Sequence, residues 1–318
     1  MTMTFITAEQ INQLAKPHQL IDKLQNAFAS DIETPLRQHY DIPNPDSSRE
    51  TTLLMMPSWQ VGKDIGVKLV SVVPESYKYQ LPSIKGVYVL IDAKTGQVKA
   101  MLDAPSLTAK RTAAASALAS RFLSDPNSKS LLMIGTGTLS SELIEAHCAV
   151  RPIEQVYVWG RNHEKAHQVV KRTAHLSVNV EAVSNLDDAI GKVDIISCAT
   201  MSITPLIKGS LLKPGQHLDM VGAYRPDMRE ADDQCLLSSR IVVDNYQGAL
   251  KETGDLAIPL KNNVIRKEKI EADLFELCRE QKYFERNNSD ITFFKSVGHA
   301  LEDLAAAQLI VEKLMESA

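Results

Sequence analysis

The sequence predicts an α/β protein, with a doubly wound parallel sheet in one domain and a discontinuous α+β arrangement in the other. Three observations lead to this fold class. The chain has 318 residues, more than a single hydrophobic core usually holds. Extended segments follow one another between residues 35 and 103, as in an antiparallel sheet. After residue 130, continuous apolar segments alternate with helical ones, as in a parallel sheet.

Composition and charge restrict the class of partner. Hydrophobic residues make up 44% of the chain and charged residues 23%, which is typical of a globular protein and excludes wholesale disorder. A net charge of −4 and an aromatic content of 5% give no reason to expect a nucleic-acid partner. No apolar run reaches the roughly 18 residues of a membrane helix, so no membrane partner is expected.

The N-terminal segment and the cysteines indicate a cytoplasmic protein. The sequence MTMTFITAEQ lacks the basic and apolar regions of a signal peptide. The four cysteines are widely spaced and form no C-x-x-C pair, which favours reduced thiols over disulfides or a zinc site. We therefore expect a soluble protein of the cytoplasm.

The first part of the chain predicts one helix and then a sheet. Thr7 and Gln10 have the spacing of a capping box, which predicts a helix over 7–30. Thr95 and Gly96 form a hairpin-type turn between two extended segments. The expected strands are 35–42, 51–57, 65–73, 86–92 and 97–103.

The second part predicts a helix and then the parallel sheet. The alanine-rich stretch 106–124 predicts a helix of about four turns, with Thr108 as its N-cap. A breaker sequence, DPNSKS, ends it. Strands are then expected at 131–135, 155–159, 178–183, 193–199, 217–221 and 240–244.

The tail predicts an amphipathic helix after Gly298 that returns to the first domain. This return makes the first domain discontinuous, with expected bounds of 1–112 and 297–318, and leaves 113–296 for the parallel sheet. The apolar side of the closing helix carries Leu301, Leu304, Ala305, Leu309 and Val311.

A glycine-rich loop follows the first parallel strand. Residues 131–134 run directly into G-x-G-x-x-S, and a helix begins there. The two glycines allow a tight turn and close approach of the backbone to a pyrophosphate, and the helix N-terminus supplies free N–H groups. Serine replaces the third glycine of the full fingerprint and is small enough for the helix to pack on the strand. The context predicts a Rossmann-type dinucleotide site, with contacts from Gly135, Thr136, Gly137, Thr138 and Leu139.

The end of the second parallel strand bears on the choice of cofactor. An NAD-preferring site usually has an acidic residue there to bind the ribose 2′-OH. This chain has Gly160, Arg161 and Asn162 instead, and an arginine suits a 2′-phosphate. A solvated arginine at a helix start is the alternative interpretation. We expect NADPH, with NADH remaining open.

Residues 163–167 spell H-E-x-x-H, a zinc-binding pattern when it lies on a helix. Here it begins the crossover helix beside the expected adenosine pocket, and no third ligand follows at a known spacing. We interpret these residues as the polar face of an exposed helix and expect no metal.

Several further segments give the chain a family resemblance. They are P-L-R at 35–37, G-V-K-L-V-S at 66–71, L-T-A-K-R-T-A-A at 107–114, V-G-A at 221–223, E-T-G-D-L at 252–256 and K-S-V-G at 295–298. With the glycine loop, their order and spacing resemble those of the ornithine cyclodeaminase/mu-crystallin family from about residue 35 to the C-terminus.

The resemblance implies a homodimer whose first domain binds substrate and carries the dimer interface, next to a Rossmann domain. It implies that Arg37 and Lys68 hold the substrate carboxylate and are catalytic, and that Val297 and Tyr224 contact the substrate. The glycine loop, Arg161 and Asn162 are already expected to contact the cofactor. The resemblance and the carboxyl edge of the sheet imply further cofactor contacts from Ser83, Arg111, Thr112, Thr200, Met201, Val221, Gly222 and Ser296.

Residue chemistry agrees with the roles of the two cations. An arginine on a strand, as we expect for Arg37, can bind a carboxylate through two parallel hydrogen bonds, although a surface ion pair is the alternative. Lys68 lies in an otherwise apolar strand, so it is either at an exposed edge or desolvated, with a pKa lowered toward neutrality. Arg111 is expected in the first turns of its helix, where a phosphate partner would explain a cation, although surface exposure is the commoner explanation.

Two departures from the family pattern narrow the activity. Tyr224 stands where cyclodeaminase members carry an aspartate, and Leu139 replaces the usual glutamine of the glycine loop. The resemblance therefore implies an NAD(P)H-dependent reductase that converts Δ1-pyrroline-2-carboxylate to L-proline, with the piperideine homologue as a second substrate. The alternatives are an ornithine or lysine cyclodeaminase, an alanine dehydrogenase, and a non-enzymatic cofactor-loaded binding protein.

Overall fold

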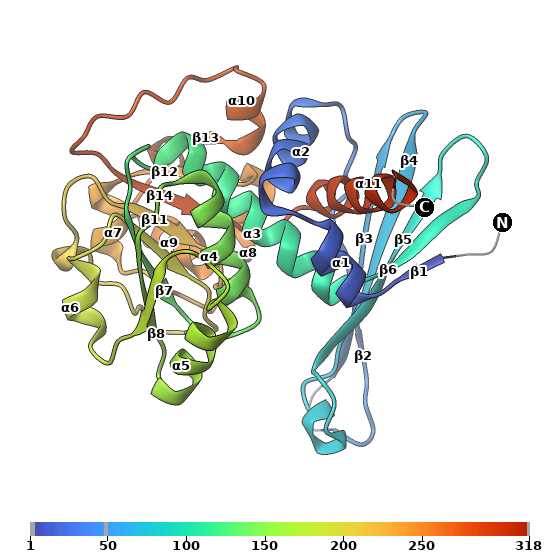
Figure 1. Ribbon diagram of the computed structural model, residues 1–318, viewed down its shortest axis with the longest axis horizontal. Helices are drawn as coiled ribbons and strands as arrows, with labels where there is room; N and C mark the ends of the chain where they lie inside the picture. The colour runs from blue at the N-terminus through green and yellow to red at the C-terminus, as the bar shows by residue number, and fades with distance from the viewer. Residues whose placement is uncertain (1–3, 48–49, 317–318) are drawn as a thin grey trace. The chain divides into compact units, whose positions relative to one another are not determined.

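The computed structural model describes residues 4–47 and 50–316 (Figure 1). The chain divides into two compact units. The first unit contains Met1–Arg111 and His299–Ala318, and the second contains Thr112–Gly298. The predicted boundaries of the first domain, after residue 112 and before residue 297, lie one and two residues from the observed ones.

The first unit contains a six-stranded sheet in the order β1-β6-β5-β4-β3-β2. Strands β2 to β6 pair in antiparallel fashion, whereas β1 pairs in parallel with β6. The five predicted strands are confirmed, and β1 was missed because three residues show no period. The bounds are β1 Thr4–Ile6, β2 Gln38–Ile42, β3 Thr51–Gln60, β4 Asp64–Val72, β5 Ile84–Asp92 and β6 Val98–Asp103.

The helices of the first unit correct one prediction. The single helix over 7–30 is wrong: α1 (Ala8–Leu14) ends, and α2 (Pro17–Ala29) begins at a proline. Proline lacks the N–H that would continue α1 but suits the first position of a new helix. The capping box of Thr7 and Gln10 is confirmed. A short 3₁₀ helix, η1 (Ser76–Tyr79), precedes β5.

The C-terminal helix α11 (Ala300–Glu316) packs on one face of this sheet. The Ser58 hydroxyl donates to the Ala300 carbonyl at 3.0 Å, and the Gln308 amide donates to Asp64 at 2.9 Å. The predicted return of the tail to the first part of the chain is therefore confirmed. All five predicted apolar residues of α11 are buried.

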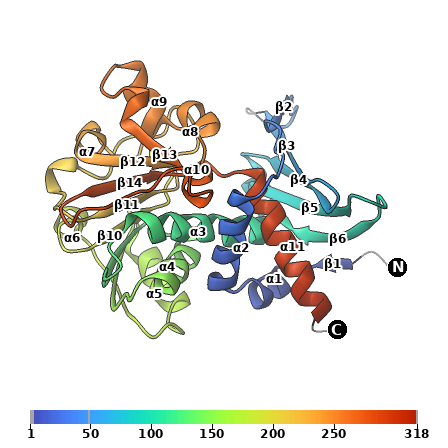
Figure 2. The same cartoon turned by 90° about the horizontal axis from the view of Figure 1, so that it is seen from above.

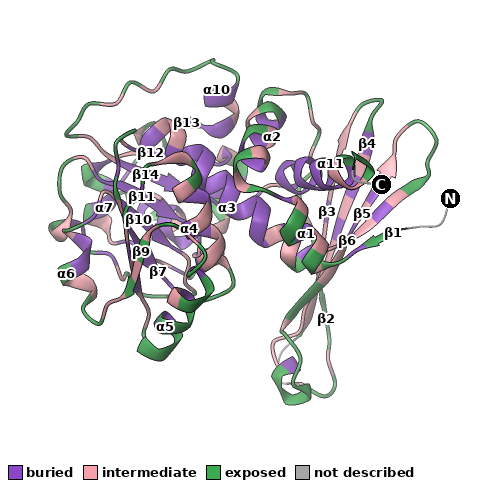
Figure 3. Ribbon diagram, viewed as in Figure 1, coloured by how far each residue is buried: buried purple, intermediate pink, exposed green. Residues whose placement is uncertain are grey.

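The second unit contains an eight-stranded, wholly parallel sheet in the order β13-β12-β14-β11-β10-β7-β8-β9. The six predicted strands are confirmed, but β13 and β14 were missed, and β14 inserts between β11 and β12. Burial on both faces of the central strands explains their continuous apolar sequences (Figure 3). The bounds are β7 Ser130–Ile134, β8 Gln155–Trp159, β9 Asn179–Ala182, β10 Ile195–Cys198, β11 His217–Met220, β12 Ser239–Val243, β13 Ile270–Asp273 and β14 Ile291–Lys295.

Helices lie on both sides of this parallel sheet, with α4 and α5 on one side and α7, α8 and α9 on the other (Figure 2). This arrangement is the doubly wound one that the sequence predicts. The helices are α4 Leu139–Val150, α5 His163–Arg172, α6 Leu186–Ile190, η2 Gly209–Leu211, α7 Asp233–Ser238, α8 Tyr246–Glu252, α9 Gly254–Lys261, η3 Lys267–Lys269 and α10 Leu274–Cys278.

Helix α3 (Ala104–Leu123) begins two residues before the alanine-rich stretch 106–124 that predicts it. Thr108 is therefore in its second turn and is not its N-cap, so that prediction is wrong. The Asp103 carboxylate accepts from the Ser106 N–H at 2.9 Å and occupies the capping role instead. Within residues 4–47 and 50–316, no helix combines the length and apolarity needed to cross a membrane.

Candidate functional site

Lys68 is a buried cation on the first unit's sheet. The alternation of β4 directs Asp64, Gly66 and Lys68 toward the face that α11 covers, and Lys68 is only 3% exposed. Its Nζ lies 2.7 Å from Oδ2 of Asp303, a fully buried residue in the first turn of α11. Lys68 and Asp303 therefore form a buried ion pair between β4 and α11.

The environment of Lys68 changes its proton affinity. Burial is the largest influence and lowers the pKa of Lys68 to about 8, although Asp303 opposes this effect. The positive charges of Arg111 and Arg37 lower the same pKa further. Of the two positions that the sequence leaves open for Lys68, an exposed edge or a desolvated site, the structure has the desolvated one. Such a group can exchange protons near neutral pH.

Arg111 joins the same buried group. Its Nη1 donates to Glu302 Oε2 at 2.6 Å and its Nε donates to Asp303 Oδ1 at 3.1 Å. Burial opposes ionisation of Asp303, but Lys68 and Arg111 outweigh it and lower the pKa of that carboxyl. Arg111 is the eighth residue of α3, so its predicted place in the first turns is wrong. The carboxylates of Glu302 and Asp303 both pair with it.

Arg37 lies in the segment that precedes β2, not on a strand as predicted, and is half-buried. Its charge contributes to the lowered pKa values of both Lys68 and His299. Three cations, Arg37, Lys68 and Arg111, and two carboxylates, Glu302 and Asp303, therefore make up what we call the cation cluster.

His299 borders the cation cluster and was missed by sequence reasoning. Its Nε2 lies 3.1 Å from the Thr34 hydroxyl. Burial, and then the charge of Arg37, lower the pKa of His299 to about 4, so the imidazole is neutral at pH 7. Its position directly after the K-S-V-G segment was the only available signal.

Ser83 lies away from the cation cluster along the sheet. It immediately precedes β5, and its carbonyl accepts from the Val73 N–H at 2.8 Å. Lys68 pairs with Tyr88 in the sheet register. Ser83 is five residues from Tyr88, or about 16 Å along a strand. The first unit therefore does not bring Ser83 next to Lys68.

The second unit has a cavity of about 540 Å³ at the carboxyl ends of β7, β8 and β10, which we call the glycine-loop pocket. This is the edge at which ligands bind in open parallel sheets. Its walls include most of the residues predicted from the glycine loop and the two neighbouring strand ends. The lining residues are Gly135, Thr136, Gly137, Trp159, Gly160, Arg161, Asn162, Lys165, Ala199, Thr200, Met201, Ser202 and Leu206.

The two glycines of the loop have different structural roles. Gly135 has φ +119°, and a Cβ there would lie 2.5 Å from the Ala199 carbonyl oxygen, so glycine is required by the fold itself. A Cβ at Gly137 would meet no atom within 4 Å and would occupy open space. Ser140 is buried and donates to the Gly135 carbonyl at 3.0 Å, as expected of a small residue at the third position.

The remaining loop residues lie at the start of α4. Thr138 precedes the helix with α-helical dihedral angles and is exposed, and Leu139 is its half-buried first residue. Neither residue lines the glycine-loop pocket. The backbone N–H groups at the start of α4 adjoin the turn, and that of Ser140 donates to the Gly137 carbonyl at 3.3 Å. The open space at Gly137 leaves room for a pyrophosphate.

The end of β8 contributes cations to the same pocket. Arg161 and Lys165 are exposed and line it. The side-chain Oδ1 of Asn162 accepts from the Lys165 N–H at 3.1 Å and caps α5. A Cβ at Gly160 would lie 2.5 Å from Thr136 Cγ2, so the Thr136 side chain would have to shift to admit it.

Most of the other predicted residues lie in the loops that follow β10, β11 and β14. Thr200 and the exposed Met201 line the glycine-loop pocket, whereas Val221, Gly222 and Tyr224 belong to the neighbouring loop after β11 and do not line it. Tyr224 is exposed and Val221 is buried. Ser296 and Val297 follow β14, where the Val297 N–H donates to Asp244 at 2.8 Å. Thr112 is a buried residue of α3.

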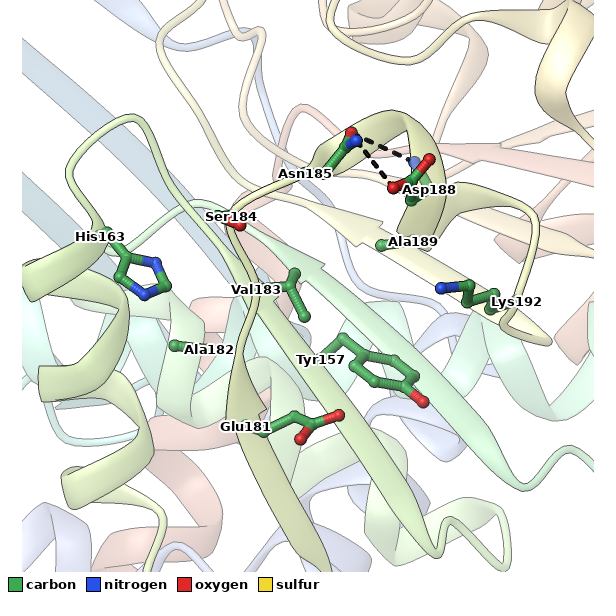
Figure 4. Close-up of a pocket in the computed structure, with 10 residues that line it drawn as sticks. All are labelled: Tyr157, His163, Glu181, Ala182, Val183, Ser184, Asn185, Asp188, Ala189 and Lys192. Atoms are coloured by element: carbon green, nitrogen blue, oxygen red, sulfur yellow. Dashed lines mark hydrogen bonds between the residues drawn. The ribbon is translucent and has the colours of Figure 1, made fainter.

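A second cavity, of about 370 Å³, lies beside β8 and β9, with α5 and α6 contributing side chains (Figure 4). His163, from the H-E-x-x-H segment, lines it. His163 Nε2 lies 3.1 Å from His167 Nε2, so the two rings contact each other. In the residues that the structure describes, no three histidine, cysteine or acidic side chains are grouped to hold a metal.

Comparison with known proteins agrees with this architecture. The Δ1-pyrroline-2-carboxylate reductase of Colwellia psychrerythraea is 37% identical over 320 residues, which cover 99% of this chain and 100% of the relative. The structure of Thermococcus litoralis Δ1-pyrroline-2-carboxylate reductase in complex with NADH and L-proline is similar at a TM-score of 0.92 and 33% identity, covering 99% and 98% of the two chains.

An archaeal alanine dehydrogenase dimer with bound NAD is also similar, with a TM-score of 0.90, 25% identity, and coverage of 100% of this chain and 97% of the other. The model of the ornithine cyclodeaminase/mu-crystallin family matches residues 1–318. The chain therefore belongs to the ornithine cyclodeaminase/mu-crystallin family.

Proposed function

We propose that this protein is an NAD(P)H-dependent reductase of cyclic imino acids. Its main substrate is Δ1-pyrroline-2-carboxylate, which it reduces to L-proline, and Δ1-piperideine-2-carboxylate is a second substrate that yields L-pipecolate. The observation that carries this proposal is the buried cation cluster around Lys68, in a chain whose second unit has a glycine-loop pocket. Relatives at 32–37% identity that act on Δ1-pyrroline-2-carboxylate support the choice of substrate.

The cation cluster supplies the chemistry that the substrate needs. Arg37 and Lys68 bind the carboxylate, and Arg111 adds positive charge from α3. A C=N carbon accepts a hydride most readily when its nitrogen carries a proton. Lys68, with a pKa of about 8, can hold or deliver that proton at neutral pH, and Asp303 at 2.7 Å keeps its ammonium group in place.

The glycine-loop pocket fits the nicotinamide cofactor. The bound cofactor supplies the hydride. Gly135, Thr136 and Gly137 receive the pyrophosphate, with Thr138 and Leu139 at the helix N-terminus. The further residues that we propose as cofactor contacts are Arg161, Asn162, Thr200, Met201, Val221, Gly222, Ser296, Ser83, Arg111 and Thr112, and those proposed for the substrate are Val297 and Tyr224.

We expect NADPH to be preferred over NADH because Arg161 and Lys165 line the pocket at the end of β8. Replacing Arg161 with serine should weaken NADPH binding about tenfold, the effect of losing one charge-assisted hydrogen bond, and should leave NADH binding nearly unchanged. Fluorescence titration of both cofactors measures this. Equal losses for NADPH and NADH would mean that Arg161 does not bind a 2′-phosphate.

A substrate panel tests the proposed reaction against its family alternatives. Both cyclic imines are offered with reduced cofactor, and ornithine, lysine and alanine are offered with oxidised cofactor. We expect turnover of the imines and no ammonia from ornithine, because Tyr224 stands where cyclodeaminases carry an aspartate. Ammonia release, or cofactor binding without turnover of any imine, would contradict the proposal.

The assembly that we propose is a homodimer formed through the sheet of the first unit. On the face of this sheet opposite α11, Val67 of β4 and Val87, Val89 and Ile91 of β5 alternate with the buried residues and are only half-buried. A second copy of the same face is an apolar partner of matching shape, and the related alanine dehydrogenase is a dimer.

Replacing Val89 with aspartate is expected to convert the dimer into a monomer, because a charge would be buried in an apolar interface. Light scattering coupled to size-exclusion chromatography measures the mass. The control is Leu237→Asp, which changes an exposed leucine of the second unit and should leave the dimer intact. A wild-type monomer would refute the assembly without bearing on the reaction.

We place the protein in the cytoplasm, in agreement with its cysteines. The four cysteines are free thiols. Burial raises the pKa of Cys148 to about 11 and that of Cys278 to about 12, which keeps both thiols protonated. Unpaired, protonated thiols are typical of a reducing compartment.

A further inference from the structure

A buried carboxylate that no sequence motif signals lies behind the glycine-loop pocket. Glu230 is fully buried, and its side chain accepts four hydrogen bonds. Oε1 accepts from the Thr200 N–H at 2.6 Å and from the Thr200 hydroxyl at 2.8 Å. Oε2 accepts from the N–H groups of Gly222 at 2.7 Å and Ala223 at 3.1 Å. One carboxylate therefore joins the loops that follow β10 and β11.

Two further buried charges complete this network. Lys295, the last residue of β14, lies 3.0 Å from Asp255 Oδ2 and 3.9 Å from Glu230 Oε2. Asp255 Oδ1 accepts from the backbone N–H of Glu230 at 2.8 Å and of Ala231 at 3.2 Å. Burial raises the pKa of Glu230, and Lys295 opposes this effect. The ends of three neighbouring strands and the start of α9 are thus linked through Glu230, Asp255 and Lys295.

The hydrogen-bond partners of Glu230 suit an ionised carboxylate. Each of its oxygens faces two hydrogen-bond donors, and a carboxylate has lone pairs for all four. An amide of the same shape would direct its own N–H groups at one pair of donors. The close approach of these groups also needs a glycine at position 222, because a Cβ there would collide with Thr200 and Glu230.

We propose that Glu230 is a positioning residue for the dinucleotide, holding the Thr200 wall of the glycine-loop pocket against the Gly222 turn. Glu230 does not touch the ligand, since it is fully buried behind the two loops. Its effect is to fix the wall formed by Thr200, Met201 and Ser202 before the cofactor arrives. This proposal rests on the proposed function of the pocket.

The variant Glu230→Gln tests the proposal, because it keeps the size of the side chain and removes the ability to accept from all four donors. We expect the Kd values for NADPH and NADH to rise about tenfold or more, corresponding to about 1.4 kcal/mol or more. The KM for the imine at saturating cofactor should stay within about twofold. If Glu230 had a purely structural role, the variant would have a lower melting temperature, without a rise in cofactor Kd at an unchanged imine KM.

The matched control is Glu271→Gln on β13, a partly buried glutamate that pairs with Arg240 at the other end of the sheet. This control should leave both cofactor affinities unchanged. The double variant Glu230→Gln with Lys295→Met separates loop positioning from charge neutralisation. Positioning predicts that affinity stays low in the double variant, whereas recovery would assign Glu230 to neutralising Lys295 and overturn the proposal.

Hydrogen exchange on the wild-type protein covers the case in which Glu230→Gln does not fold. The amides of Thr200, Gly222 and Ala223 should be protected before any cofactor is added. Protection that develops only when NADPH binds would overturn the proposal. If the wild type binds no dinucleotide, the proposed function fails; if it binds and turns over but Glu230→Gln behaves normally, only the role of Glu230 fails.

Discussion

Replacing Lys68 with methionine is expected to abolish imine reduction in a chain that remains folded. Methionine fills a similar volume but cannot bind the carboxylate or hold a proton. We expect kcat/KM to fall by at least about 10³-fold, within the range of lost acid–base catalysis combined with lost binding. Asp303 Oδ2 loses Lys68, which should lower the melting temperature, but Oδ1 keeps Arg111 as a partner at 3.1 Å.

Steady-state kinetics of this variant with Δ1-pyrroline-2-carboxylate measure the loss. The matched control is Lys99→Met, which removes a lysine on β6 that also forms an ion pair, 2.6 Å from Asp64, but is partly exposed. The control should keep wild-type kcat/KM. Normal reduction by Lys68→Met over a series of pH values would remove Lys68 from the mechanism.

The pKa of Lys68 predicts a pH dependence with a definite sign. Lys68 is protonated below about pH 8 in the folded protein, so kcat/KM should fall as pH rises through this value. A Lys68→Arg variant that retains activity should lack this step, because arginine stays charged. The same step in the arginine variant would assign the titration to another group.

Stability should depend on pH in the opposite sense. The folded-state pKa of about 8 lies below the ordinary value of 10.5, so between these values the unfolded chain binds more protons than the folded one. The stability of the wild type relative to Lys68→Met should therefore rise as pH increases from about 8 to 10.5. Urea unfolding of both proteins across this window measures it, and a decrease would contradict the burial of a charged Lys68.

The second large effect is expected at Gly137, whose Cβ position is open space. Gly137→Val should leave the melting temperature unchanged but place atoms where the pyrophosphate is proposed to lie. A steric cost of about 1–3 kcal/mol corresponds to dinucleotide affinity lower by roughly 10- to 100-fold. Titration of NADPH, combined with thermal unfolding, measures both quantities.

Gly135 provides the contrast within the same motif. Gly135→Ala should lower the melting temperature itself, because its backbone has φ +119° and its Cβ would lie 2.5 Å from the Ala199 carbonyl. Gly96, with φ +72° and open surroundings, is the control for backbone strain alone, and Gly96→Ala should leave cofactor affinity intact. Normal NADPH affinity in Gly137→Val would show that the dinucleotide does not cross this turn.

The parts of the site that the sequence predicts are those encoded locally. A strand, two glycines and a helix start form one continuous segment at 131–140, so the turn at Gly135 is predictable before any tertiary contact is known. The buried state of Lys68 follows from its apolar strand neighbours in the same way. A three-residue element such as β1 gives no comparable signal.

The parts that the sequence does not predict depend on contacts between distant segments. Glu302 is 191 residues from Arg111, and its burial against that arginine depends on the return of α11 to the first unit. Glu230 lies in a loop eight residues after Gly222, with no motif around it, and acquires its role only when β10 and β11 become neighbours. Pairing of this kind follows from topology rather than from local sequence.

The central claim is that the protein uses the cation cluster for the imine and the glycine-loop pocket for the cofactor of one reduction. A stoichiometric assay tests this claim most directly. The wild-type protein is mixed with NADPH and Δ1-pyrroline-2-carboxylate, the nicotinamide absorbance is followed, and L-proline is quantified at the end. We expect one L-proline for each NADPH oxidised, at a rate proportional to protein concentration. Tight NADPH binding with no oxidation in the presence of either cyclic imine would contradict the proposed reaction.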